Sequence, residues 1–170
     1  MPFTPFHLGP ALAVGLPLRE RIHAPTFILA SIAVDVEPLV VLVLGLDYPL
    51  HGYLHTFAGA ALLGLCLGLL MHATEKVLGN AWKRALLEGS RSVGFEGFAV
   101  AGILGCTVHV LLDSPLYPDI RPLYPYAANP LYDPSLTPAV YLLCSVLLLG
   151  GLAYYLYLAL QHQAKQGLAR

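Results

Sequence analysis

The sequence predicts an all-α integral membrane protein, a helical bundle with about four transmembrane helices and a short N-terminal half-membrane helix. Of its 170 residues, 57% are hydrophobic and 11% are charged, and the mean hydropathy is +0.69. Four apolar stretches approach the ~20 residues that a helix needs to cross a bilayer. A soluble domain would need more polar residues to cover its water-exposed surface. Lipid must therefore contact much of this protein's surface. We find no internal repeat and expect one membrane-embedded domain over residues 1–170.

The expected elements follow the apolar stretches in chain order. Residues 5–18 cover only about 20 Å at ~1.5 Å per residue, which predicts a half-membrane or re-entrant helix packed against the others. Residues 114–137 are rich in Pro and Tyr. Since prolines exclude a regular helix and tyrosines favour the membrane interface, we expect a stiff outer lid there, or alternatively a simple aromatic belt. The spans are expected at residues 25–46, 55–72, 94–113 and 138–160.

The basic residues predict an orientation, because Lys and Arg are retained on the cytoplasmic side. The loops on one side of the predicted bundle hold Arg121 as their only basic residue. The apolar N-terminal stretch has its charges after it, the reverse of a secretory signal, so it is expected to stay on the protein. We therefore expect a multi-pass protein of the cytoplasmic membrane whose main spans start and end in the cytoplasm. The opposite side holds Arg19, Arg21, Lys76, Lys83, Arg84, Arg91, Lys165 and Arg170.

Charge and cysteine content exclude other classes. The net charge of -1 does not provide the clustered Lys and Arg of a nucleic-acid surface, so no nucleic-acid partner is expected. Cys66, Cys106 and Cys144 each lie in an apolar run without CxxC spacing. They are interpreted as buried, inert residues and not as disulfide or metal-binding positions.

Two carboxylates interrupt the first predicted span. Asp35 and Glu37 lie in the sequence SIAVDVEPLVV, and a carboxylate at such a depth costs about 2.5–3.5 kcal/mol on insertion scales, so each needs a partner or a function. Two residues apart on a regular helix, they point ~200° from each other. Pro38 can distort the helix locally, because it lacks an N–H and crowds the preceding turn. Both residues are therefore candidates for one site.

Two further pairs indicate a metal site toward the outer half of the membrane. His51 and His55 precede the second span, and His109 and Asp113 end the third. Residues four apart lie on one helical face, ~5–6 Å apart at Cβ, a spacing that suits shared metal coordination. Imidazole combined with carboxylate suits zinc and similar divalent ions. The alternative is a set of interhelical hydrogen bonds and buried ion pairs that only hold the bundle together.

His7 reaches the same level if the N-terminal helix runs from mid-membrane to the cytoplasmic side. At ~1.5 Å per residue, His7 then lies about 18 Å above Arg19, and Asp35 about 15 Å above Pro25. His7 is therefore a candidate ligand or a neighbour of the ligands, with a helix cap or an interface residue as the alternative. The remaining candidates are interpreted as interfacial: His23, His72, His162 and Glu96.

At these residues the chain resembles a known family, the small membrane-bound metal-dependent hydrolases that include the LexA-regulated inner-membrane proteins of the YdjM type. The family pattern is an N-terminal His followed by Gly, an acidic DxD-like motif, an HxxxH motif and a later HxxxD motif. The resemblance covers roughly residues 1–115. Here the motifs are His7 with Gly9, Asp35 with Glu37, His51 with His55, and His109 with Asp113.

The chain departs from the family pattern at two places. Glu37 is followed by Pro38, where the family has Asp followed by His, and HGYLHT replaces HRGxxHS, which removes a basic residue between the histidines. The family is distantly similar to zinc-dependent phospholipase C and the single-strand nucleases, which are all-helical enzymes with several zinc ions. That relation implies phosphoester chemistry, which the spacings alone do not indicate.

The resulting hypothesis is a membrane-embedded hydrolase that cleaves a phosphoester or ester of a lipid-like substrate with a metal-activated water. Asp35 or Glu37 would accept the proton of that water. The expected cofactor is one or two divalent ions, zinc before manganese, and the expected partners are membrane lipid and a substrate from the outer leaflet. The expected metal ligands are His7, Asp35, His51, His55, His109 and Asp113.

Two other functions remain open at this stage. Intramembrane acids and histidines also form relays in transporters or channels for protons or divalent metals. Such a path needs polar residues down to the cytoplasmic face, whereas the inner halves of the second and third spans (LLGLCLGLL and GFAVAGILG) are almost wholly apolar. A scaffold with a structural metal is the second alternative, in which protein atoms fill every coordination position. The oligomeric state is left open.

Overall fold

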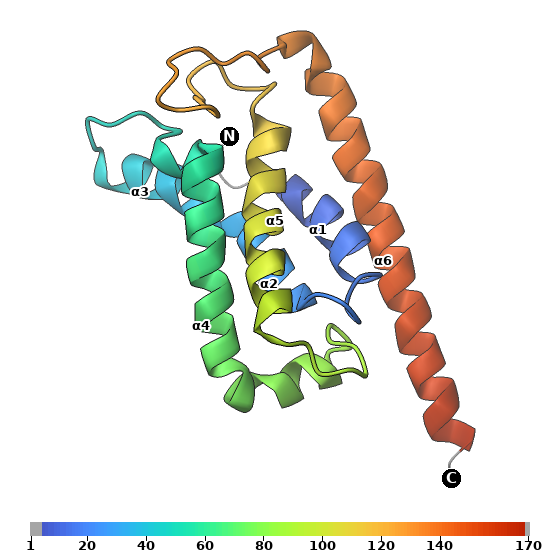
Figure 1. The fold of residues 1–170 in the computed structure, drawn as a ribbon. Coiled ribbons are helices and arrows are strands. Elements are labelled where there is room, and N and C mark those ends of the chain that lie inside the picture. Colours follow the sequence, from blue (N-terminus) through green and yellow to red (C-terminus); the bar gives the residue numbers. More distant parts are fainter. Residues whose placement is uncertain (1–4, 169–170) are drawn as a thin grey trace.

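The computed structural model describes residues 5–168, and all its regular elements in that range are helices, as predicted (Figure 1). Four helical stretches are long and apolar enough to cross a membrane: Ala24–Leu44, Phe57–Arg84, Phe95–Asp113 and Pro134–Leu168. The elements in chain order are η1 (Pro5–His7), α1 (Leu8–Gly15), α2 (Ala24–Ala33), α3 (Val36–Leu44), η2 (Tyr53–His55), α4 (Phe57–Arg84), α5 (Phe95–Asp113), η3 (Pro134–Leu136) and α6 (Thr137–Leu168).

Helix α5 is the centre of the bundle and packs against α4 and α2, while α1 packs between α2 and α6 (Figure 1). Small residues allow these close approaches. A β-carbon added to Gly102 of α5 would overlap the backbone carbonyl of Gly64 on α4. A β-carbon at Gly105 would lie 2.7 Å from the carbonyl oxygen of Phe27 on α2. The backbones of α4, α5 and α2 are therefore nearly in contact, which holds the side chains at their upper ends in fixed positions.

The N-terminal helix is short. Helix α1 has eight residues, which corresponds to about 12 Å at ~1.5 Å per residue, too little to cross a bilayer. The α-helix ends at Gly15, earlier than the predicted limit of residue 18, and turns lead from there to the start of α2. Its close contact with α6 depends on Gly9, where a β-carbon would overlap the Cys144 carbonyl oxygen.

The first span breaks at Asp35. Helix α2 ends at Ala33 and α3 starts at Val36, so that Asp35 occupies the N-cap position of α3, where its side chain makes no capping hydrogen bond. Pro38 has no N–H to give to the preceding turn, and the backbone tightens there, with the Glu37 N–H donating to the Val34 carbonyl at 3.2 Å. Helix α3 turns aside from the direction of α2 (Figure 1). The local distortion expected from Pro38 is therefore present.

Two helices extend beyond their predicted spans, to Arg84 in α4 and to Leu168 in α6. Three basic residues expected in a loop, Lys76, Lys83 and Arg84, therefore belong to α4. Residues 114–133 form turns with no regular helix, as the prolines predict. Cys66 is exposed on α4, so the expectation that all three cysteines are buried is wrong for this one: α4 directs it away from the bundle.

Candidate metal centre

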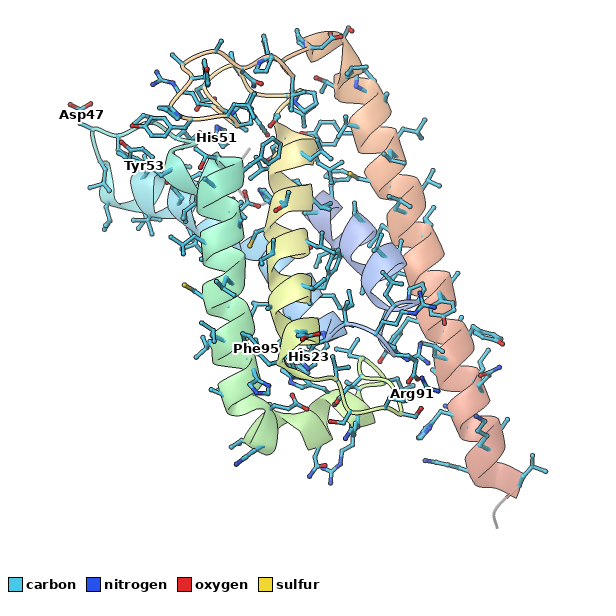
Figure 2. The ribbon with its side chains drawn as sticks, in the orientation of Figure 1. His23, Asp47, His51, Tyr53, Arg91 and Phe95 are labelled. Carbon is cyan, nitrogen blue, oxygen red and sulfur yellow. The ribbon has the colours of Figure 1, made fainter. Side chains whose placement is uncertain are left out.

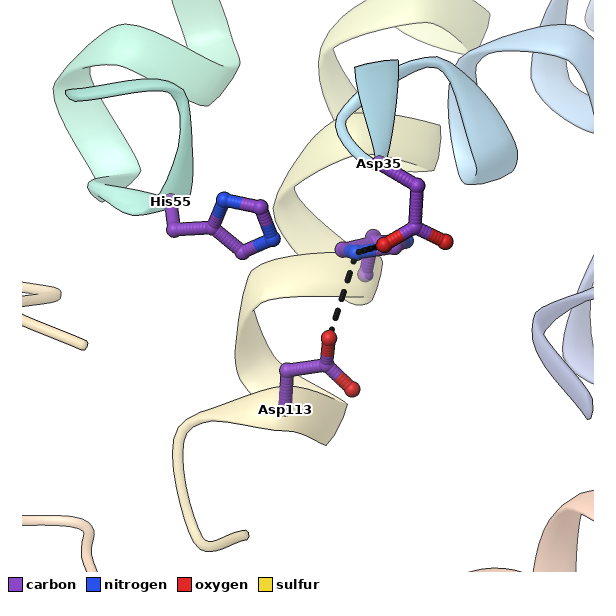
Figure 3. A group of neighbouring side chains, drawn as sticks. Asp35, His55 and Asp113 are labelled. Carbon is purple, nitrogen blue, oxygen red and sulfur yellow. Dashed lines mark ion pairs between the residues drawn. The ribbon is translucent and has the colours of Figure 1, made fainter. Parts of the chain in front are cut away.

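Four buried side chains converge where α5, η2 and the α2–α3 break meet (Figure 3). Asp35, His55, His109 and Asp113 each offer one ligand atom, and these atoms all lie within 4.8 Å of one another. The Nε2 atom of His109 lies 3.3 Å from Asp113 Oδ2 and 3.5 Å from Asp35 Oδ1. The most exposed of the four is Asp113, at 4%. The sequence spacing therefore brings acids and imidazoles from three segments to one point.

A backbone carbonyl fixes the proton on His109. The Nδ1 atom of His109 lies 2.8 Å from the carbonyl oxygen of Ser31, and a carbonyl can only accept a hydrogen bond. Nδ1 must therefore carry the proton and donate it to Ser31. The lone pair of neutral His109 is left on Nε2, which faces the two aspartates and has no hydrogen-bond partner in the described structure. This is the arrangement in which a histidine binds a metal ion.

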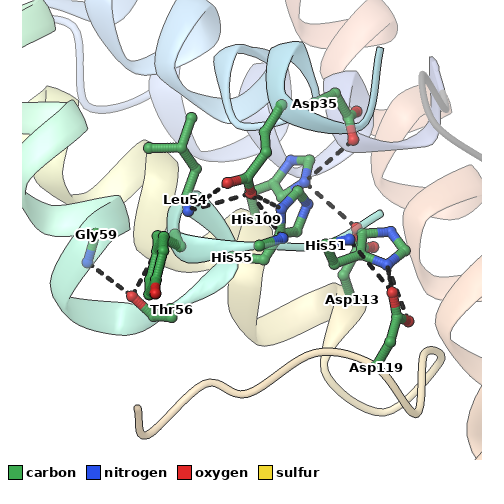
Figure 4. Close-up of polar contacts among 12 residues, drawn as sticks. Asp35, His51, Leu54, His55, Thr56, Gly59, His109, Asp113 and Asp119 are labelled. Atoms are coloured by element: carbon green, nitrogen blue, oxygen red, sulfur yellow. Dashed lines mark hydrogen bonds and ion pairs between the residues drawn. The ribbon is translucent and has the colours of Figure 1, made fainter. Parts of the chain in front are cut away.

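A carboxylate fixes His55 in the same way (Figure 4). The Nδ1 atom of His55 lies 3.1 Å from Glu37 Oε2. Glu37 also accepts hydrogen bonds from the backbone N–H groups of Gly52 at 2.9 Å and Leu54 at 3.1 Å, and from the Tyr48 hydroxyl at 3.2 Å. Burial lowers the pKa of His55, which favours the neutral imidazole that metal binding requires. Its Nε2 atom is buried, without a hydrogen-bond partner in the described residues.

His7 and His51 flank the four-residue cluster. His7 Nε2 lies 3.1 Å from Asp113 Oδ1, and its ring stacks on His109 with centroids 3.9 Å apart. His51 lies one layer outward: its ring centroid is 4.7 Å from that of His55, and its Nδ1 is 2.9 Å from Asp119 Oδ2. Both histidines therefore border the cluster, and neither belongs to the four-atom group.

No sequence pattern points to Ser31 or Asp119 as part of this site. Ser31 acts through a backbone carbonyl, which no side-chain pattern reveals. Asp119 is one acid among the prolines and tyrosines of the outer segment, and its position in that turn gives no signal of contact with His51. Both residues orient a ring nitrogen and contribute no atom to the cluster.

A cleft of about 440 Å³ is lined in part by His51. It lies between the segment before α4 and the Pro- and Tyr-rich segment after α5, and Figure 2 shows His51 and Tyr53 below that second segment. Arg121, the only basic residue expected on this side, also lines the cleft. The cleft therefore places aromatic and cationic groups beside the histidine cluster.

One residue interpreted as interfacial is buried instead. His23 is 0% exposed; it caps α2 through Thr26, and its ring stacks on Phe98 with centroids 4.0 Å apart. Burial lowers its pKa from 6.5 to about 4. The interfacial interpretation is wrong for His23, because the turn before α2 folds its ring under α5. The other three, His72, His162 and Glu96, are exposed.

The donor set fits a divalent cation. Two imidazoles and two carboxylates are ligands that divalent metal ions accept. Comparisons with protein-family models, with curated proteins and with solved structures found no match to this chain. The resemblance to membrane-bound metal-dependent hydrolases therefore stays a prediction from motifs. The structure provides a buried His/Asp group that can hold a metal ion.

Proposed function

We propose that this protein is a membrane-embedded hydrolase dependent on a divalent metal ion, zinc or manganese, held by Asp35, His55, His109 and Asp113. One observation carries the proposal. The Ser31 carbonyl and the Glu37 carboxylate accept hydrogen bonds from Nδ1 of His109 and His55, so the Nε2 lone pairs of both rings face the buried aspartates. Buried polar atoms without partners are costly. A cation coordinated at this point satisfies all four groups at once.

The side chains around the cluster have separate roles in this proposal. The four residues would hold a divalent ion, which would activate water for hydrolysis and polarise the scissile bond. Glu37 already accepts four hydrogen bonds, which favours an orienting role over proton transfer. Asp35 lies at the helix break, with one carboxylate oxygen 3.5 Å from His109 Nε2, so we assign the proton-accepting role to the Asp35 carboxylate. His7 and His51 are further ligands or support for the ligands.

The cleft favours a lipid-like ester or phosphoester as the substrate. Its walls combine Tyr53 and Tyr124 with Arg121, a set suited to the interface of a membrane. The basic ends of α4 and α6 lie at the far end of the bundle. By the positive-inside rule, we propose that the protein lies in the cytoplasmic membrane with the cleft on the outer side. The substrate then enters from the outer leaflet.

Ion transport is the principal rival, and the packing below the cluster argues against it. Buried side chains from α2 and α5 fill the interior between the cluster and the opposite end of the bundle. They form apolar clusters, which disfavour the passage of a hydrated ion. They include Phe27, Ala30, Val34, Ala101 and Cys106.

An assay with defined lipids tests the proposed activity. Protein reconstituted in vesicles of phosphatidylglycerol and phosphatidylcholine is incubated with zinc or manganese, and products are identified by mass spectrometry. We expect a released headgroup or acyl chain that disappears with a chelator and in Asp113→Asn. His72→Ala, which changes an exposed imidazole away from the cluster, serves as the matched control and keeps full activity. Equal product from wild type and Asp113→Asn contradicts the assignment.

A further inference from the structure

A second group of imidazole and carboxylates lies at the opposite end of the bundle. It joins His23 at the start of α2, Glu75 on α4 and Glu88 in the turn after α4. One ligand atom from each lies within 4.8 Å of the other two. Figure 2 places His23 at the lower end of α5, far from His51. The proposed hydrolase centre does not use these residues.

The polar atoms of this group are buried and incompletely satisfied. His23 is 0% exposed, and its Nε2 atom points at Glu75 Oε2 at a distance of 3.3 Å. Glu88 is 9% exposed. In the described structure His23 Nε2, Glu75 Oε2 and Glu88 Oε2 are buried without a hydrogen-bond partner. The Glu75 side chain keeps 23% exposure, but its Oε2 atom is buried. The Glu75 and Glu88 carboxylates approach within 4.8 Å of each other, which favours a positive charge between them.

The turn that carries Glu88 is held from two sides. Leu86 has φ 59°, in the left-handed region that residues other than glycine seldom adopt. The Tyr155 hydroxyl of α6 donates to the Ala85 carbonyl oxygen at 3.0 Å. Further along, the Ser90 N–H donates to Glu20 at 3.0 Å. These contacts fix the backbone on both sides of Glu88 and direct its side chain toward Glu75.

We propose that His23, Glu75 and Glu88 form a second divalent-cation site, which ties α2, α4 and the turn after α4 together. Two carboxylate oxygens and one imidazole nitrogen form a donor set suited to manganese or zinc. The site is independent of the hydrolase centre and stands whether or not that centre is catalytic. Its role is to clamp the end of the bundle that carries most of the basic residues.

His23 differs from the histidines of the first centre in how its other nitrogen is held. Its Nδ1 atom accepts the Thr26 N–H at 3.3 Å and lies 2.7 Å from the Thr26 hydroxyl oxygen. Without a cation, Nδ1 is thus the acceptor, and the Nε2 proton points at Glu75. Cation binding moves the proton to Nδ1, where the Thr26 hydroxyl can accept it. The Thr26 N–H then loses its long hydrogen bond to Nδ1, while Nε2 gains a coordination bond to the metal ion.

Manganese binding to the full-length protein in detergent tests the proposal. The protein is stripped with a chelator and titrated with Mn²⁺, and free Mn²⁺ is followed by electron paramagnetic resonance. His109→Ala removes the first centre and Glu88→Gln the second, with the exposed acid variant Glu96→Gln as the matched control. We expect both single variants to bind one ion fewer than wild type, the double variant to bind neither ion, and Glu96→Gln to match wild type.

The unfolding temperature is measured as well, because a variant that does not fold would also lose Mn²⁺ binding. Mn²⁺ should raise the unfolding temperature of His109→Ala and leave that of the double variant unchanged. Glu75→Gln replaces Glu88→Gln if circular dichroism shows that the latter is unfolded. Equal Mn²⁺ binding by His109→Ala and by the double variant overturns the proposal. Unchanged stoichiometry in a folded Glu88→Gln protein overturns it as well.

Discussion

The Nδ1 atom of His109 donates to the Ser31 carbonyl oxygen at 2.8 Å, and this contact directs the lone pair of the ring toward Asp35 and Asp113. Glu37 does the same for His55 from α3. Each histidine is therefore oriented by an acceptor on the first span, on either side of the break at Asp35. Because the first span breaks at Asp35, its two halves can each direct a hydrogen-bond acceptor at one of the two histidine rings.

Removing the charge of Glu37 is expected to weaken metal binding without abolishing it. In Glu37→Gln, the amide no longer holds the Nδ1 proton of His55 as strongly, and loss of such an orienting partner typically reduces metal affinity by ~10–100-fold. Competition with a chromogenic chelator measures the change. The exposed Glu96→Gln variant is the control. An affinity equal to that of wild type would show that the Glu37 contact does not orient a ligand.

Substitution of Asp119 distinguishes an effect on substrate turnover from an effect on metal binding. Asp119 holds His51 at the cleft but lies outside the four-residue group. Asp119→Asn is therefore expected to lower turnover of the lipid substrate, by about tenfold for a lost orienting contact, while the metal content stays at the wild-type level. Loss of metal in this variant would instead place His51 among the ligands.

Close packing of α4 on α5 predicts a large effect at Gly102. A leucine there must displace the backbone at Gly64, and overpacking of this kind costs about 1–3 kcal/mol or more. The denaturation midpoint in detergent should fall accordingly. Gly150 of α6 has no atom within 4 Å of an added β-carbon, so Gly150→Leu serves as the control. Equal midpoints for the two variants would contradict the observed helix contact.

The Glu20 contact predicts a pH dependence at the opposite end of the bundle. The Ser90 backbone N–H, with that of Arg91, lowers the pKa of Glu20 below its ordinary 4.5. A lowered pKa stabilises the folded state above pH 4.5, and this gain disappears as the pH falls through the folded-state value. Glu20→Gln should therefore unfold at a slightly lower temperature than wild type at pH 7, the effect being small because Glu20 is exposed. The two melting curves should converge in acid, and a constant difference across pH would exclude the charge as the cause.

The sequence predicts the helices better than their ends. Hydropathy locates α5 within one residue, because Gly94 and Ser114 flank it with non-apolar positions. Hydropathy also predicts that the second span ends at His72, whereas α4 continues to Arg84. The Lys and Glu residues after His72 lower the hydropathy, but they are good helix formers, so the helix does not end there. The clustering of His109 and Asp113 with Asp35 follows from helical periodicity and depth.

The contacts that orient the site could not be predicted in this way. Ser31 contributes a main-chain oxygen and Asp119 lies in an irregular turn, so neither leaves a periodic pattern. The second cluster depends on the turn after α4, where the left-handed Leu86 brings Glu88 back toward the helices. Tertiary packing decides such positions, and His23 was therefore misassigned to the interface.

Metal content shows whether Asp35, His55, His109 and Asp113 hold an ion. Wild-type protein, purified gently in detergent, is compared with His109→Ala by inductively coupled plasma mass spectrometry, with His162→Ala as a control for an exposed imidazole. We expect wild type and His162→Ala to carry the same stoichiometric zinc or manganese, and His109→Ala to have lost one ion. Equal metal content in folded wild type and His109→Ala would contradict this expectation.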